Sequence, residues 1–227
     1  MKLWTAIVGS HMWRMNHKDS DLDLFVVYID DTADILYGKN FRGGRHFQSD
    51  DKKLEGTQYE LGHVVEQLQK GNINFLWGTT SPYIYYHNHF GRKLHKQLYD
   101  IVMANLPKNY FKAINGMAQK NLWKYFKTRV DVENKRFTHD IIHFDDRQKE
   151  LKKLAQIYRT LLQGLTLMND KFIEYRSAPY AILNFKNIKA ILCHFHADYD
   201  ECPLPEKPKR KPFYEFLVNA RLTRMVN

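Results

Sequence analysis

The spacing of apolar residues changes character near the middle of the chain. In the first half, short apolar runs are separated by polar or glycine-containing stretches, a pattern typical of strands and short helices joined by turns. The sequence predicts strands over residues 2–8, 21–29 and 53–58 and helices over 59–71 and 91–107.

Three intervening segments give weaker patterns. Residues 30–53 are polar, contain glycine and have no clear period, so we expect a long loop with one short element at most. Ser10 is expected to cap a short helix over residues 11–16. Residues 75–79 form a brief apolar segment.

In the second half, apolar residues recur at helical intervals. Helices are predicted over residues 109–130, 145–170 and 213–226, and we expect no strand after residue 108. Strands in one half and helices in the other predict an α+β fold with two domains, 1–106 and 107–227.

Two carboxylates open the most apolar predicted strand. Asp21 and Asp23 are separated by one leucine, and side chains in a strand alternate between faces, so both acids share a face while Leu22 and Leu24 point toward a core. One interpretation is a polar strand edge that faces water. The other is a Mg²⁺ site, because Mg²⁺ takes one or two carboxylates together with substrate phosphates.

The net charge of +10 is unevenly distributed. Residues 1–106 contain 12 Lys/Arg and 12 Asp/Glu, whereas residues 107–227 contain 23 and 13, so the whole excess lies in the second half. A basic region favours polyanionic partners such as triphosphates or nucleic acid. A lysine-rich solvated surface is the alternative interpretation.

Composition excludes some classes of protein. With 227 residues, 44% of them hydrophobic, the chain can bury a substantial core. We expect no membrane contact, because no run of 18 apolar residues occurs. Cys193 and Cys202 are the only cysteines, which fits a reducing compartment, and we predict a cytoplasmic protein.

Two further clusters have structural explanations that we favour. Residues 193–202, CHFHADYDEC, lack the spacing of a zinc site, so packing at a helix end explains them better. Residues 81–90, SPYIYYHNHF, offer aromatic rings that could stack on a base. An aromatic core or edge strand is the favoured explanation of this second cluster.

The first motif resembles a known signature. Gly9-Ser10, a short helix and then Ser20-Asp21-x-Asp23 are similar to the DNA polymerase β-like nucleotidyltransferase superfamily, and within it to the RNA-repair-pathway (RNA-ligase-associated) nucleotidyltransferases. Residues 59–78, 151–167 and 202–208 resemble later segments of that family. The chain departs at Arg14, where the family often has glycine.

The resemblance implies a fold and a chemistry. The fold would be a small mixed sheet with helices, followed by a mostly helical basic domain. Asp21 and Asp23 would hold two Mg²⁺ (or Mn²⁺) ions for in-line attack on a nucleoside triphosphate, ATP included. Nucleotide contacts would come from Gly9 and Ser10 at a helix start, and from Ser20 and Arg14.

Two metal ions call for a third acid from a neighbouring strand. Glu55, at the end of the predicted third strand, is the preferred candidate, because the related family has an acid near that place. Asp50 and Asp51 stay open, and Glu60 is better explained as a cap of the following helix. Arg159 falls where the family has a basic residue, which implies a triphosphate contact.

Three functions are compatible with these residues. The first is transfer of a nucleoside monophosphate from an NTP to a hydroxyl on RNA, in repair or end addition. The second is the same transfer to a protein or a small molecule. The third is an inactive nucleic-acid-binding module, which the intact Gly9-Ser10 and Asp21-x-Asp23 motifs disfavour.

Overall fold

A computed structural model describes residues 1–38, 43–126, 128–131, 136–139, 147–170, 175 and 184–226. The chain forms two compact units. The first comprises Met1–Pro107 and Glu206–Asn227, and the second comprises Lys108–Pro205.

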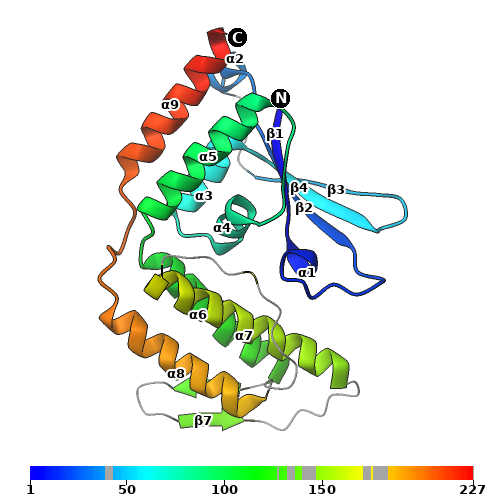
Figure 1. The fold of residues 1–227 in the computed structure, drawn as a ribbon, viewed down its shortest axis with the longest axis vertical. Coiled ribbons are helices and arrows are strands. Elements are labelled where there is room, and N and C mark those ends of the chain that lie inside the picture. Colours follow the sequence, from blue (N-terminus) through cyan, green and yellow to red (C-terminus); the bar gives the residue numbers. More distant parts are fainter. Residues whose placement is uncertain are drawn as a thin grey trace. The chain divides into compact units, whose positions relative to one another are not determined.

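The first unit is built on a five-stranded sheet in the order β3-β4-β2-β1-β5 (Figure 1). Its strands are β1 (Lys2–Ile7), β2 (Leu22–Tyr28), β3 (Arg45–Gln48), β4 (Leu54–Glu60) and β5 (Ile84–Tyr86). Only the β2–β4 pair is parallel, and the β1–β2, β1–β5 and β3–β4 pairs are antiparallel. Parallel pairing brings the starts of β2 and β4 to the same end of the sheet.

The described residues of the first unit form six helices, which are α1 (Gly9–Met12), α2 (Thr32–Leu36), α3 (Leu61–Gln69), α4 (Ile73–Thr80), α5 (His89–Ala104) and α9 (Arg210–Val226). Of these, α3, α4 and α5 pack against the sheet, and α9 packs on α3 and α5. The core forms where Phe25 and Tyr59 of the sheet meet Phe75 of α4, with ring centroids 4.7 to 5.4 Å apart. Each fully buried large apolar side chain in such a core stabilises the fold by about 1.5–3 kcal/mol.

The second unit contains α6 (Asn109–Phe126), α7 (Arg147–Asp170) and α8 (Phe185–Glu201), with a two-stranded sheet of β6 (Thr128–Asp131) and β7 (Arg136–His139). Helix α7 packs against α6 and α8. The prediction of an α+β fold is confirmed. The expectation of helices throughout the second half is wrong at the β6–β7 hairpin, where Thr128 and Val130 have β-branched side chains that favour strands.

The predicted division into domains 1–106 and 107–227 placed the last helix in the second domain, whereas the structure places it in the first unit. Helix α9 packs against α3 and α5, so residues 206–227 belong with the first unit. The Arg221 guanidinium pairs with Glu60 and donates to the Asp30 carbonyl, and Arg224 donates to the Ile29 carbonyl. These contacts across the sequence explain a location that local periodicity does not reveal.

Other local predictions are also corrected. The expected loop over 30–53 contains two elements, α2 and β3, and the apolar segment 75–79 lies within α4. Ser10 does not cap α1, because the cap position is Val8 and no side chain caps that helix. The charge excess is shared: residues 108–205 contain 17 Lys/Arg and 11 Asp/Glu, and residues 206–227 contain six and two.

Candidate active site

Three carboxylates meet at one end of the five-stranded sheet. Asp23 lies directly opposite Glu55 in the parallel register of β2 and β4, and Asp21 precedes β2 by one residue. One oxygen from each of Asp21, Asp23 and Glu55 lies within 4.8 Å of the other two. The structure therefore brings together the three acids that the sequence singled out, with Glu55 at the place of the third acid.

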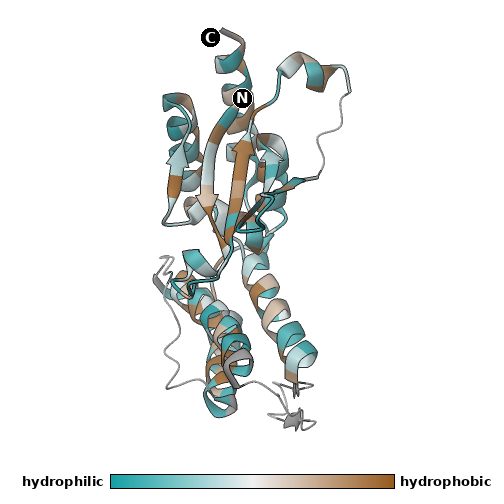
Figure 2. Cartoon of the chain, turned by 90° about the vertical axis from the view of Figure 1, so that its right-hand side faces the viewer, coloured by the Kyte–Doolittle hydropathy of each residue, from teal (hydrophilic) through white to brown (hydrophobic). Residues whose placement is uncertain are grey.

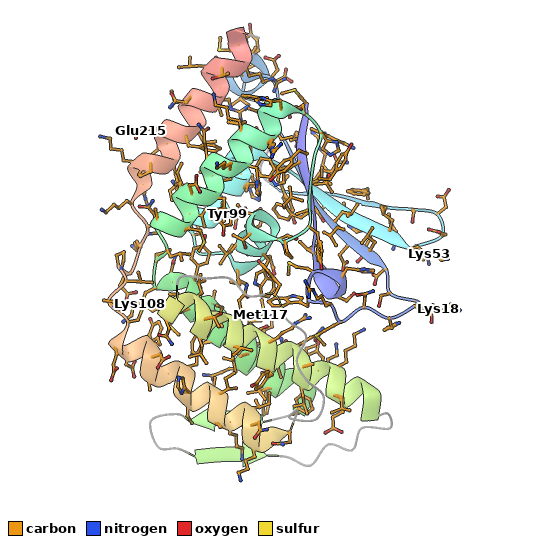
Figure 3. The ribbon with its side chains drawn as sticks, viewed as in Figure 1. Lys18, Lys53, Tyr99, Lys108, Met117 and Glu215 are labelled. Carbon is orange, nitrogen blue, oxygen red and sulfur yellow. The ribbon has the colours of Figure 1, made fainter. Side chains whose placement is uncertain are left out.

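Backbone pairing holds this arrangement in register. The Leu22 amide donates to the Lys53 carbonyl over 2.8 Å, just before the two acids face each other. A one-residue slip would send Glu55 to the opposite face, because strand side chains alternate. Lys18 and Lys53 extend from the loops that precede β2 and β4 (Figure 3), and both are exposed.

The face that carries the acids differs from the sequence-based expectation. Asp23 shares its face with Phe25, which packs on Phe75 and Gly78 of α4, so the acids lie at the end of the helix-covered face. Leu24 lies on the opposite face and is half-buried. The assignment of Leu22 and Leu24 to the core side was wrong, because α4 covers the face that carries Phe25.

The cluster is electrostatically strained. Burial, the hydrogen bond with Glu55 and the charges of Asp21 and Glu55 together raise the pKa of Asp23 to about 6, and burial contributes most. The positive potential of His11 lowers it slightly. Like charges at this spacing disfavour ionisation, and an added cation relieves them.

Gly9 allows the loop after β1 to approach Asp23. Its φ is +62°, and a Cβ built there would lie 1.7 Å from Asp23 Oδ2. The neighbouring Val8 amide donates to the Asp23 carbonyl over 2.9 Å. Only glycine fits both the left-handed backbone and the contact with the carboxylate, so the Gly-Ser turn is placed directly beside the acids.

The residues after Gly9 add polar groups. The Ser10 hydroxyl and His11 Nε2 are buried and have no hydrogen-bond partner among the described residues. Arg14 is exposed and adopts φ +54°, a conformation that glycine prefers, and its Nε lies 3.4 Å from the Tyr83 hydroxyl. The departure from glycine at this position thus keeps a glycine-like backbone and adds a cation.

Ser20 shapes the loop before β2. Its hydroxyl accepts from the His17 amide over 2.9 Å, and its own amide donates to the His17 carbonyl. This local turn orients Asp21 at the start of the strand. A nucleotide contact from Ser20 stays a prediction.

The alternative third acids have other contacts. Asp51 accepts from Ser49 Oγ and the Lys53 amide, so it stabilises the β3–β4 turn. Glu60 is the N-cap of α3, accepts from the Gly62 amide over 2.6 Å and pairs with Arg221. The expectation that Glu60 caps the helix is confirmed. Among the described residues, Asp50 does not join the acidic cluster.

Two residues near the acids were missed by the sequence analysis. Gln48 on β3 lies opposite Glu55, with Nε2 3.5 Å from a Glu55 oxygen, and His11 acts on Asp23 electrostatically. His11 directly follows Gly9-Ser10, so its place beside that motif is a signal by which the sequence identifies it. Gln48 lies in the segment expected to be a loop, so only the β3–β4 pairing reveals it.

Outside this cluster, Arg159 lies on α7 of the second unit, and its triphosphate contact stays a prediction. In the 193–202 cluster, His194 Nε2 lies 3.4 Å from Asp198 Oδ2, and His196 Nε2 lies 3.2 Å from Asn115 Oδ1 on α6. These contacts fit the packing interpretation of that segment. No other metal-like group of His, Cys, Asp and Glu occurs in the described part of the chain.

The donor set suits a divalent cation. Three carboxylates supply hard oxygen ligands at one strand end, and the charges of Asp21 and Glu55 add to burial in raising the pKa of Asp23. A mixed sheet that brings such acids beside a Gly-Ser turn fits a nucleotidyltransferase of the polymerase β type. Residues 2–177 match the model of the RNA repair pathway DNA polymerase beta family, and the chain belongs to this family.

A solved structure of a nucleotidyltransferase-like protein from Exiguobacterium sibiricum aligns over 97% of this chain and 68% of its own, at 13% identity and a TM-score of 0.31. No curated protein matches the chain. Within the described residues, no helix is both long and apolar enough to span a membrane.

Proposed function

We propose that the chain transfers a nucleoside monophosphate from an NTP to a hydroxyl group on RNA, in RNA repair or end addition. The observation that carries the proposal is the cluster of Asp21, Asp23 and Glu55 within 4.8 Å beside the Gly9-Ser10 turn. The name of the family, with its RNA repair pathway, supports an RNA acceptor. Cytoplasmic location stays a prediction.

Asp21, Asp23 and Glu55 are the residues that would hold Mg²⁺ or Mn²⁺. When bound, two such ions supply Lewis acidity to the triphosphate and lower the pKa of the acceptor hydroxyl. The carboxylates must be ionised to do so, and Asp23, with its pKa raised to about 6, is ionised at neutral pH. Asp23 and Glu55 lie opposite each other on paired strands, so the distance between them is fixed. Catalysis by proximity requires such rigid positioning of the reacting groups.

The Gly9-Ser10 turn would receive the triphosphate. Gly9 leaves the backbone open beside Asp23, and the buried Ser10 hydroxyl has a donor to offer. Arg14 and the exposed Lys18 and Lys53 add positive charge around the same sheet end. Arg159 is proposed as a further triphosphate contact from the second unit.

Transfer to a protein or a small molecule uses the same catalytic groups and is the second candidate. The experiment incubates the protein with each labelled NTP and Mg²⁺, in the presence of total RNA, protein extract or neither. Label in RNA supports the proposal. Label in protein, or in a small product formed without either extract, supports the second candidate. No label with any NTP, from folded protein, contradicts both.

A further inference from the structure

Exposed aromatic rings lie on the edge strand β5 and on the residues that flank it. Residues at alternate positions of a strand share a face, so Tyr85 and His87 project together, and their ring centroids are 5.0 Å apart. Tyr85 is 67% exposed and Tyr83 is 38% exposed. The favoured explanation of this segment as an edge strand fits β5, but packing does not explain rings that remain in solvent.

Tyr85 belongs to a row of side chains that crosses all five strands. The backbone registers place these residues side by side: Tyr85, Thr5, Val26, Gln58 and Arg45. We call them the open sheet face. They lie on the side of the sheet away from Phe25 and α4, and Figure 2 shows that side toward the viewer, with helices of the first unit behind it.

The chemistry of the open sheet face is basic and aromatic. Arg45 is exposed, and its guanidinium carbon lies 5.7 Å from the Tyr28 ring centre on the same face. Lys2 lies opposite Tyr28 and is also exposed. The acid in the row of Tyr28, Glu60, is 2% exposed and is paired with Arg221, so it offers no free negative charge. The apolar member, Val26, is only 3% exposed, so solvent meets rings, cations and polar groups rather than an apolar patch.

The open sheet face leads to the end of the sheet that holds the carboxylates. Strand β5 runs antiparallel to β1, so Tyr83 lies beside Ile7, two residues before Gly9, and its carbonyl accepts from the Ile7 amide. The Tyr83 hydroxyl lies 3.4 Å from Arg14 Nε, in the loop after α1. A strand that follows His87, Tyr85 and Tyr83 is thereby directed toward Arg14 and the Gly-Ser turn.

We propose that the open sheet face binds the single-stranded end of the RNA acceptor, with a base stacked on Tyr85 and phosphates near Arg45 and Lys2. The inference rests on the proposed function, because it names where that acceptor lies. Exposed rings bind bases of any sequence, since every base has a flat face, and a surface with cations and no acid attracts the phosphate backbone. An apolar protein ligand would leave Arg45 and Lys2 without partners.

The test measures fluorescence anisotropy of a labelled single-stranded oligouridine with the full-length protein and no NTP. Tyr85→Ala is expected to weaken binding about tenfold, within the range for loss of one stacked base. Tyr85→Leu, which keeps apolar bulk, is expected to weaken it similarly, and Tyr85→Phe to preserve it. Tyr37→Ala is the matched control, because Tyr37 is 89% exposed on the first unit but lies after α2.

Charge gives a second readout. Arg45→Gln should reduce the slope of log affinity against log salt by roughly 0.7, the value for one phosphate contact on a single strand. An RNA duplex should bind with no dependence on Tyr85, because its bases are already stacked. A similar loss for duplex and single strand on Tyr85→Ala would overturn the stacking proposal.

Failure of the inference and of the proposed function are distinguishable. If the wild-type protein binds oligouridine and Tyr85→Ala and Tyr85→Leu bind it equally well, the open sheet face is not the acceptor site, while RNA transfer stands. If the wild-type protein binds no RNA at low salt and labels protein instead, both proposals fail. Retention of a protein by wild type but not by Tyr85→Ala, without RNA binding, would assign the face to a protein and overturn the inference.

Discussion

Strand β4 has an acid near each end, and the two acids have opposite surroundings. Glu60 is 2% exposed, accepts from the Gly62 amide and pairs with Arg221, so its charge is fully compensated. Glu55 is half-buried beside Asp23 and Asp21, and the ion pairs of the described residues include none between Glu55 and a Lys or Arg. Arg221 neutralises Glu60, the acid that connects α3 to α9. Glu55, which faces Asp21 and Asp23, has no such basic partner in the described part of the chain. Uncompensated charge on rigid strands is what a cation site requires.

The largest expected effect is on activity at the uncompensated end. Glu55→Gln should reduce nucleotide transfer by more than about 100-fold, because even indirect partners of metal ligands cost 10–100-fold. The same change should leave the protein folded, and should raise the unfolding free energy of the metal-free protein by up to about 1 kcal/mol, because one like charge is removed. Transfer assays and chemical denaturation measure the two effects.

The matched control for Glu55→Gln is Glu66→Gln, a half-buried acid on α3 that is paired with Lys70. It should alter neither activity nor stability appreciably. Full activity in Glu55→Gln would remove Glu55 from the cluster's function and direct attention to Asp21 and Asp23 alone.

At the compensated end, the effect should be on stability. Glu60→Ala should lower the unfolding free energy by about 3–5 kcal/mol, because it leaves the Arg221 guanidinium without its buried partner. Metal-dependent transfer by the remaining folded protein should be nearly unchanged. Denaturant unfolding of Glu60→Ala and of the double variant Glu60→Gln/Arg221→Met tests this, and the double variant should recover part of the loss. Equal stability of Glu60→Ala and wild type would contradict the contrast between the two ends.

Two glycines with similar backbones sharpen the comparison. Gly9 and Gly38 have φ of +62° and +83°, but a Cβ at Gly9 would meet Asp23 whereas a Cβ at Gly38 would meet nothing within 4 Å. Gly9→Ala and Gly38→Ala should each lower the unfolding free energy by about 1–2 kcal/mol for the left-handed conformation. Only Gly9→Ala should also reduce transfer, by displacing the Asp23 carboxylate. Both variants are tested by denaturant unfolding and by transfer assays. Equal transfer activities would show that the function of Asp23 tolerates a displaced carboxylate.

The smallest effect concerns His95, a second buried group whose hydrogen bonds are satisfied. Its Nε2 lies 2.8 Å from the Thr79 carbonyl and its Nδ1 lies 3.1 Å from the Tyr86 hydroxyl. Burial lowers its pKa below the usual 6.5, so below that pH the unfolded chain takes up a proton that the folded chain refuses. The contribution of His95 to stability is therefore present at pH 7 and is lost as the pH falls below about 6.5.

The measurement for His95 is the unfolding free energy at pH 8 and at pH 5. The wild type should lose more stability over that interval than His95→Gln, which has no titrating ring. An equal loss in both proteins would show that other groups dominate the acid response.

Much of the candidate site was predictable, because local chemistry specifies it. Gly9-Ser10 and the Asp21-x-Asp23 spacing are readable in the sequence, whereas the preference for Glu55 over Asp50 and Asp51 came from the family resemblance. The cap at Glu60 follows from its place before an amphipathic helix. What could not be predicted is pairing: Gln48 reaches Glu55 only because β3 and β4 form a hairpin, and Arg221 reaches Glu60 across 161 positions.

The sequence by itself determined the strand and helix periods, the α+β class and the residue types of the cluster, because these depend on neighbours within a few positions. The tertiary structure decided which strand lies beside which, which face α4 covers, and that α9 closes onto the first unit. Those outcomes depend on the total apolar area buried and on contacts between distant segments. Apolar burial has no direction of its own, so local periodicity leaves the partner undetermined.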